Sequence, residues 1–156
     1  MAEKDNALLS IVIMAAGKGT RMKSALPKIL HRLAGRSLLQ HVLAAVAPLQ
    51  ARHTVVVTGF GAPAVQTQVQ GPGMTCVLQE PQWGTGHAVQ QAVPKLPAQG
   101  TTLILNGDGP LMRTETARAL VAASGGERLA LLTVDLADPA GYGRIVRDAA
   151  GAVRAI

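Results

Sequence analysis

The most constraining feature of the sequence is an apolar run, Ile11 to Met14, that stops abruptly at a loop of small and basic residues. The loop extends to Pro27-Lys28, after which an apolar pattern at helical spacing begins. A short, continuous apolar run bounded by glycines is typical of a buried strand. The pattern therefore predicts an inner strand that ends in a loop suited to bind phosphate.

The composition of this loop supports that prediction. Gly17 and Gly19 lack a Cβ atom, so the backbone can take positive φ and approach a ligand closely, and consecutive N–H groups can form an anion-binding nest. Lys18, Arg21 and Lys28 supply positive charge, and an arginine can bind two oxygens where a lysine acts as a point charge. The alternative interpretation is a glycine-rich turn that carries ordinary surface cations.

Spacing excludes two well-known phosphate-binding motifs. A P-loop requires a glycine five positions before the Gly17-Lys18 pair, and Val12 stands there. The dinucleotide-binding fingerprint requires a third glycine where Met22 stands, and an acidic residue about 20 positions further on, which the chain lacks.

The composition limits the class of protein. A chain of 156 residues suits one domain with a real core, and with 48% hydrophobic but only 2% aromatic residues that core must be aliphatic. The formal net charge is +6, but the basic residues are scattered, which favours small anionic ligands over nucleic acid. The single cysteine, Cys76, excludes a disulfide framework and indicates a reducing cytoplasm.

Membrane and secretory segments are not expected. No stretch approaches the roughly 20 apolar residues of a membrane span. Glu3 and Asp5 precede the first apolar run, which ends in the glycine loop rather than in a cleavage site. We therefore expect a soluble protein of the cytoplasm without a membrane partner.

Along the rest of the chain, strand and helix patterns alternate. This alternation predicts a Rossmann-like α/β fold with a mostly parallel sheet. Ser37 and Thr114 are expected to cap helices, and Gly125-Gly126 to end the second. The expected strands lie at 54–58, 74–78, 101–105 and 129–136, and the expected helices at 38–46, 64–69, 85–93 and from 114 onwards.

The end of the sequence has a different pattern. Residues 144–147 and 152–156 flank Asp148-Ala-Ala-Gly151, which predicts an antiparallel hairpin. Because the last residues read as a strand, we expect an incomplete domain.

Polar residues follow several of the expected strands, where ligands bind in open parallel sheets. Gln79 could present a donor and an acceptor to a nucleobase edge, or be a solvated strand end. Gly84-Thr85 could let the backbone contact a base or sugar, or be a turn and helix cap. His87 is expected to pack within its helix and is not assigned to the site. Gly141 to Gly143 could also belong to the site or form a plain turn.

Asp108 is the most specific candidate. It follows an expected buried strand and is flanked by Gly107 and Gly109, so its carboxylate is placed to bind Mg²⁺, which prefers one or two carboxylates plus phosphate oxygens. The alternative is an aspartate that closes a turn before Pro110.

Five motifs in this order resemble one bacterial enzyme family. They are GKGTRM followed by PK, then Gln79, GTGHA, GD with Pro110, and GYGRI. Together they resemble the uridyltransferase half of the bifunctional UDP-N-acetylglucosamine pyrophosphorylases/glucosamine-1-phosphate N-acetyltransferases. The resemblance implies a sheet of the nucleotide-diphospho-sugar transferase type. It also implies an N-terminal extension at 1–9, a partial nucleotidyltransferase domain at 10–156, and the absence of the C-terminal β-helix acetyltransferase domain.

The resemblance also assigns roles to residues. It places Met14, Ala15, Ala16 and Gly17 against the uridine, Lys28 on the phosphates and Arg21 on the leaving pyrophosphate. It places Gln79 on the uracil, Gly84 and Thr85 along the nucleotide and sugar, Asp108 on Mg²⁺ and Gly143 on the amino sugar. Asn106 and Gly107 complete the expected substrate-binding set. At Asn106 and Gly109 the chain departs from the family pattern, which has an aromatic and a bulkier residue there.

The implied reaction is Mg²⁺-dependent transfer of a uridylyl group from UTP to N-acetylglucosamine 1-phosphate, for peptidoglycan and lipopolysaccharide synthesis. Full-length members are trimeric, whereas this chain is expected to be a monomer or weak oligomer without acetyltransferase activity. Two alternatives stay open: another nucleotidyltransferase, such as a molybdenum cofactor guanylyltransferase, and a non-catalytic nucleotide-binding domain.

Overall fold

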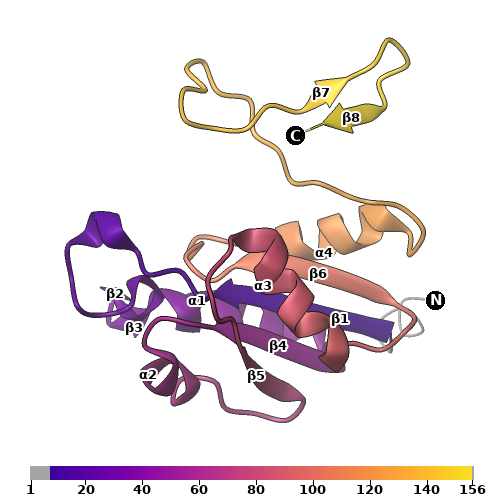
Figure 1. Ribbon diagram of the computed structural model, residues 1–156. Coiled ribbons are helices and arrows are strands. Elements are labelled where there is room, and N and C mark those ends of the chain that lie inside the picture. Colours follow the sequence, from indigo (N-terminus) through magenta and orange to yellow (C-terminus); the bar gives the residue numbers. More distant parts are fainter. Residues whose placement is uncertain (1–7, 156) are drawn as a thin grey trace.

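The computed structural model describes residues 8–155, so most of the expected N-terminal extension lies outside the described residues. Four parallel strands form the central sheet in the order β5-β4-β1-β6 (Figure 1). Ile11 of β1 pairs with Thr54 of β4 on one side and with Leu103 of β6 on the other. The prediction of a mostly parallel α/β sheet is confirmed. The strands are β1 (Leu9–Ala15), β4 (His53–Thr58), β5 (Met74–Leu78) and β6 (Thr101–Asn106).

Helices cover both faces of this sheet. Ile11 and Ile13 of β1 share a core cluster with residues of α1 (Leu38–Val46), α2 (Ala62–Gln66) and α4 (Thr114–Ser124). Val12, on the opposite face, packs with α3 (Thr85–Ala92). Because both faces of β1 are buried, its apolar residues are continuous rather than alternating.

Shorter elements connect these parts. They are η2 (Thr20–Met22), η3 (Lys28–Leu30), β2 (Arg32–Leu33), β3 (Arg36–Ser37), η4 (Ala47–Leu49) and η5 (Val93–Lys95). Strands β2 and β3 form a separate antiparallel pair. No helix within residues 8–155 is long and apolar enough to cross a membrane.

The helix ends test two predicted caps. Ser37 Oγ accepts a hydrogen bond from Gln40 N at 3.1 Å, and Gln40 Oε1 accepts one from Ser37 N at 3.1 Å, so the cap at Ser37 is confirmed as a capping box. The cap predicted at Thr114 is wrong, because α4 begins at Thr114 and its hydroxyl instead donates to Ala45 O at 2.7 Å, tying α4 to α1. Gly125, in the left-handed region, ends α4 as predicted.

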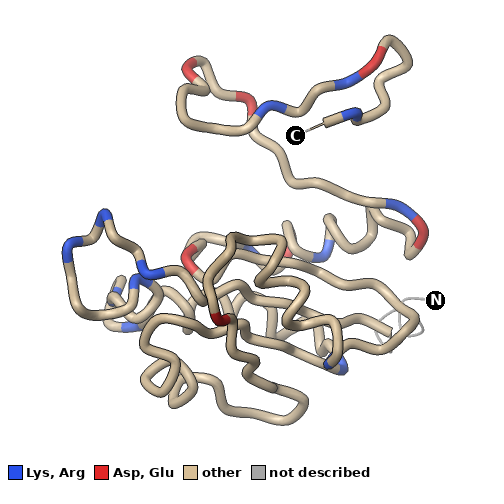
Figure 2. Tube along the Cα trace, in the orientation of Figure 1, with Lys and Arg blue, Asp and Glu red and all other residues tan. Residues whose placement is uncertain are grey.

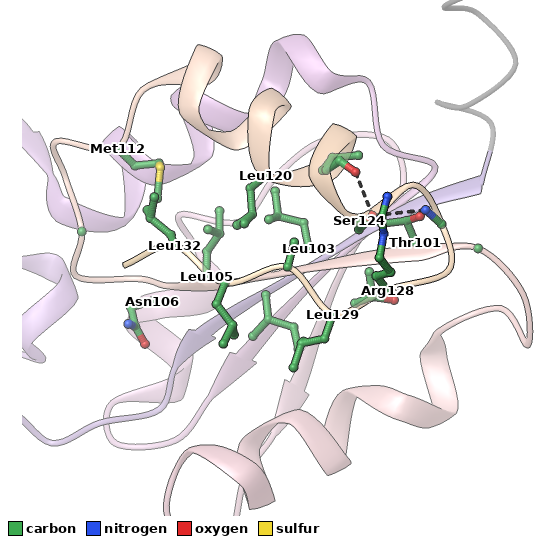
Figure 3. Close-up of a pocket in the computed structure, with 18 of the residues that line it drawn as sticks. Thr101, Leu103, Leu105, Asn106, Met112, Leu120, Ser124, Arg128, Leu129 and Leu132 are labelled. Atoms are coloured by element: carbon green, nitrogen blue, oxygen red, sulfur yellow. Dashed lines mark hydrogen bonds between the residues drawn. The ribbon is translucent and has the colours of Figure 1, made fainter. Parts of the chain in front are cut away.

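The strand predicted at 129–136 is wrong. No described strand pairs with the outer edge of β6, and residues 128–132 pass along that edge with a cavity of about 570 Å³ between them (Figure 3). Leu129 and Val134 are largely exposed. Leucine and β-branched residues indicate that a segment would fit a half-buried pleated surface. A strand also needs a neighbouring strand for its backbone hydrogen bonds, and this segment has none among the described residues.

The edge position also changes the expected burial of β6. Leu103 and Leu105 are buried, but Ile104 between them is 43% exposed. The whole strand was expected to be buried. Buried and exposed side chains instead alternate along it, because the face of β6 that carries Ile104 is not covered.

The predicted hairpin at the end of the chain is confirmed. Strands β7 (Val146–Arg147) and β8 (Val153–Ala155) pair antiparallel, and they lie apart from the main sheet (Figure 1). Asp148 Oδ1 accepts hydrogen bonds from Ala150 N at 3.0 Å and Ala152 N at 2.9 Å, which shapes the turn. Arg154 Nε donates to the other carboxylate oxygen at 2.8 Å.

Candidate active site

A cavity of about 540 Å³ opens at the carboxyl ends of β1, β5 and β6. The chain moves from β1 outwards to β5 and then returns to β6 on the other side of β1, so the strand order reverses beside β1. Ligands bind at this position in open α/β sheets. Eleven residues predicted for the site line the cavity: Met14, Ala15, Ala16, Gly17, Arg21, Lys28, Gln79, Gly84, Thr85, Asn106 and Asp108.

Two predicted residues do not line the cavity. Gly107 N donates to Met14 O at 2.9 Å, and a Cβ atom on Gly107 would lie 3.0 Å from the same oxygen, so this glycine lets β6 continue closely beside β1. Gly143 lies in the segment before β7 and is not part of the cavity wall. Its contact with an amino sugar stays a prediction.

The loop after β1 folds back onto its own end. Gly19 has φ +63°, and a Cβ atom there would lie only 2.6 Å from Lys28 Cβ. At Gly17, by contrast, a Cβ atom would meet nothing within 4 Å, which leaves open space above the backbone. The expected positive φ is therefore found at Gly19 but not at Gly17. The missing side chain of Gly19 lets Lys28 approach and face the cavity.

Basic residues concentrate along this loop (Figure 2). Lys28 Nζ donates to Asp108 Oδ2 at 2.5 Å, which joins the loop after β1 to the loop after β6. Both side chains are more than a third exposed, so the pair contributes at most about 1 kcal/mol to stability. Arg21 makes no ion pair within residues 8–155 and is held on the cavity wall by η2. The cleft thus contains two cations and one carboxylate.

Gln79 is fixed at the end of β5. Its backbone N–H donates to Thr58 O at 2.8 Å and so extends the parallel ladder past the strand, and the residue is only 4% exposed. Its side-chain Nε2 donates to Gly84 O at 2.9 Å. The amide is therefore rigidly held, as a group that reads a nucleobase must be.

His87, which was expected to pack within its helix, lies outside the cavity wall but contacts Gln79. This residue lies in the first turn of α3, and its Nδ1 atom is 3.2 Å from Gln79 Nε2. Side chains in the first turn of a helix point back toward the residues before it. The position of His87 just after Gly84 therefore indicated, from the sequence, that it could reach Gln79. The cavity wall also contains residues outside the predicted set of site residues: Thr20, Met22, Ile29, Gln82 and Ala88. Gly19, which was expected to shape the phosphate-binding loop, lines the cavity as well.

The oxygen donors of the cleft suit a hard cation that also binds phosphate. Within residues 8–155, no three His, Cys, Asp or Glu side chains gather closely enough to hold a metal ion by themselves. Asp108 supplies one carboxylate and Asn106, on the same wall, an amide. This set fits Mg²⁺, which binds one or two carboxylates and takes its other ligands from substrate phosphates and water.

Residues 11–154 match the family described as MobA-like NTP transferase domain. The chain belongs to this family. Nucleotidyltransferases of this kind bind a nucleoside triphosphate, which agrees with a cleft that gathers cations at the switch point of the sheet. The predicted assignment to the nucleotidyltransferases is thus confirmed.

Curated relatives of this NTP transferase are closely similar in sequence. The chain is 64% identical over 152 residues to the bifunctional protein GlmU of Paracidovorax citrulli, covering 95% of this chain and 32% of that protein. It is 56% identical over 145 residues to GlmU of Aromatoleum aromaticum, covering 93% of this chain and 32% of that protein. The predicted resemblance to the bifunctional enzymes is confirmed, and the chain spans about a third of their length.

Solved structures agree on the fold. Rv0371c of Mycobacterium tuberculosis superposes with a TM-score of 0.65 at 20% identity, covering 76% of this chain and 61% of that one. UDP-glucose pyrophosphorylase of Acinetobacter baumannii gives a TM-score of 0.59 at 17% identity, covering 65% of this chain and 46% of that one. The nucleotidyltransferase type of sheet is confirmed.

Proposed function

We propose that this NTP transferase domain transfers a uridylyl group from UTP to N-acetylglucosamine 1-phosphate, giving UDP-N-acetylglucosamine and pyrophosphate. The observation that carries the proposal is the cavity that joins Lys28, Arg21 and Asp108 to the rigid amide of Gln79. The identity to GlmU proteins supports the choice of substrates. The product would enter peptidoglycan and lipopolysaccharide synthesis in the cytoplasm.

The chemistry requires positioning and charge stabilisation. A phosphate oxygen of the sugar attacks the α-phosphorus of UTP, and the bond to the β-phosphate breaks as pyrophosphate leaves. The second pKa of a phosphate monoester is near 6, so the attacking group is mostly ionised at neutral pH and needs no general base. Lys28 would bind the triphosphate, and Arg21 would bind the oxygens on which negative charge develops.

Asp108 would hold Mg²⁺, with Asn106 as a neighbouring oxygen donor. When bound, the cation supplies positive charge that offsets the charge of the phosphates. Because Lys28 bonds to Asp108 Oδ2, the lysine must exchange this carboxylate for phosphate oxygens when a nucleotide binds. The ion pair thus holds both side chains in the cleft. When ligands bind, Lys28 would pair with phosphate oxygens and Asp108 with the cation.

The base and the sugar lie on opposite sides of this triphosphate site in our proposal. Met14 to Gly17, Gln79, Gly84 and Thr85 would contact the uridine. Gly143 would contact the amino sugar, which requires the segment before β7 to close on the cleft. We further propose that the chain behaves as a monomer or weak oligomer.

Pyrophosphate release tests the proposal. The assay combines UTP, N-acetylglucosamine 1-phosphate and Mg²⁺ with this chain and, in parallel, with a chain extended past Ile156. Release from UTP but not from GTP supports uridylyl transfer. Release from GTP alone, with the molybdenum cofactor supplied as acceptor in place of the sugar phosphate, would support the guanylyltransferase alternative. Nucleotide binding without release by either chain would indicate a non-catalytic domain.

A further inference from the structure

His87 stands at the centre of a small polar chain beside the cavity. One ring nitrogen, Nδ1, lies 3.2 Å from Gln79 Nε2, and the other, Nε2, lies 2.9 Å from the side-chain amide nitrogen of Gln91. The indole of Trp83 lies against the imidazole, with ring centroids 5.1 Å apart. The ring is therefore held on three sides.

A backbone carbonyl group determines the orientation of the Gln79 amide and the protonation of the His87 ring. Gly84 O can only accept a hydrogen bond, so the Gln79 atom 2.9 Å away must be the amide nitrogen. His87 Nδ1, which faces the same nitrogen, must then accept the second amide hydrogen. This requires a neutral imidazole with its proton on Nε2. The Gln91 atom 2.9 Å from His87 Nε2 is then assigned as the amide oxygen, with the amide turned over, because two N–H donors cannot bond to each other.

Both hydrogens of the Gln79 amide are thus used within the protein. From the sequence, this amide could present a donor and an acceptor to a nucleobase or lie at a solvated strand end. With one hydrogen on Gly84 O and one on His87 Nδ1, its oxygen is left as the group that can serve a ligand. An oxygen acceptor matches the imide N3–H of uracil, whereas cytosine presents a lone pair at N3.

We propose that His87 is a positioning residue that orients the Gln79 amide and so selects uracil over cytosine. The inference rests on the proposed function in one respect, namely that Gln79 faces the base. Without His87, the second hydrogen of the Gln79 amide has no partner in the protein. This hydrogen could then be donated to the N3 lone pair of cytosine. Specificity should therefore fall more than overall affinity.

The test is the ratio of the dissociation constants for UTP and CTP, measured by calorimetry with Mg²⁺. His87→Leu should lower the preference for UTP about ten-fold, the usual effect of one mismatched buried hydrogen bond. His87→Asn, whose amide oxygen can replace Nδ1 as acceptor, should restore most of it. His41→Leu is the matched control, because His41 Nε2 bonds Leu33 O at 2.8 Å outside the cavity. It should leave the ratio unchanged.

Equal weakening of UTP and CTP by His87→Leu would overturn the proposal and assign His87 a structural role. A second measurement does not depend on activity: ¹⁵N chemical shifts of the His87 ring should show an unprotonated Nδ1 and a protonated Nε2. A proton on Nδ1 would refute the proposed orientation. If pyrophosphate release fails while the UTP to CTP ratio still responds to His87, the proposed reaction is wrong and the positioning role stands. A wild-type chain that binds UTP and CTP equally would overturn the positioning role.

Discussion

Lys28 Nζ lies 2.5 Å from Asp108 Oδ2, although the two residues are 80 positions apart in the sequence. The pair spans the reversal point of the sheet, from the loop after β1 to the loop after β6. In the proposed reaction, each partner serves a different ligand. The geometry therefore couples the proposed phosphate site to the proposed metal site, and this coupling can be measured.

Removing the lysine should tighten binding of the divalent cation in the absence of nucleotide. In Lys28→Met, the Asp108 carboxylate loses its cationic partner and becomes free to bind Mn²⁺, used here as a spectroscopic substitute for Mg²⁺. Free Mn²⁺, measured by electron paramagnetic resonance, should fall relative to wild type. The double variant Lys28→Met/Asp108→Asn should lose this gain. Unchanged Mn²⁺ binding in Lys28→Met would show that the ion pair does not compete with the metal.

Replacing the carboxylate should abolish Mg²⁺-dependent turnover. Asp108→Ala removes the carboxylate proposed to bind Mg²⁺, and the cavity wall has no other acidic residue within residues 8–155. Pyrophosphate release should therefore fall to background in the extended chain. Asp135→Ala, which changes an exposed carboxylate outside the cavity, should retain the wild-type rate. An active Asp108→Ala variant would refute the metal assignment.

The two cations should each contribute to transition-state stabilisation. Removing a preorganised charged or polar group from such a site typically costs about 2.7–4 kcal/mol, so Lys28→Ala and Arg21→Ala should each lower kcat about 100-fold or more. Arg21→Lys should recover only part of the rate, because lysine cannot bind two oxygens in the guanidinium geometry. Lys95→Ala, exposed in η5, is the control. Normal turnover by both cleft variants would mean that the loop is structural.

The two loop glycines should respond differently to alanine. Gly19→Ala places a Cβ atom 2.6 Å from Lys28 Cβ at positive φ, so it should destabilise the fold by about 1–2 kcal/mol and weaken phosphate binding. Gly17→Ala meets open space, so urea unfolding should be close to wild type. If Gly17→Ala nevertheless weakens UTP binding, the loss reports close approach of the ligand. Equal stability of the two variants would contradict the described loop geometry.

The thiol should react slowly at neutral pH. Burial raises the pKa of the Cys76 thiol, so the folded chain binds this proton more tightly than the unfolded chain does. The free energy of unfolding is therefore unaffected below the ordinary thiol pKa and falls as the pH rises above it. The pH profile of the reaction with a disulfide reagent should lie at higher pH in the folded chain than in urea. Coincident profiles would contradict this shift.

Local chemistry in the sequence determined several elements. The continuous apolar residues of β1 predicted burial on both faces, and Ser37 and Gly125 predicted the start of α1 and the end of α4. The order of the motifs also predicted most of the cavity wall, because the carboxyl ends of parallel strands meet at one edge of the sheet. These features depend on residues that are close in the chain or on rules of sheet topology.

Tertiary structure decided what depends on distant partners. Residues 129–136 have a strand pattern but find no backbone partner at the edge of β6, and Thr114 donates its hydroxyl to α1 instead of capping its own helix. The Lys28–Asp108 pair and the contact of His87 with Gln79 join separate segments of the fold. Hydrogen bonds of this kind form only where tertiary packing brings a donor and an acceptor within about 3 Å of each other. Local sequence patterns do not show which distant residues will meet in this way.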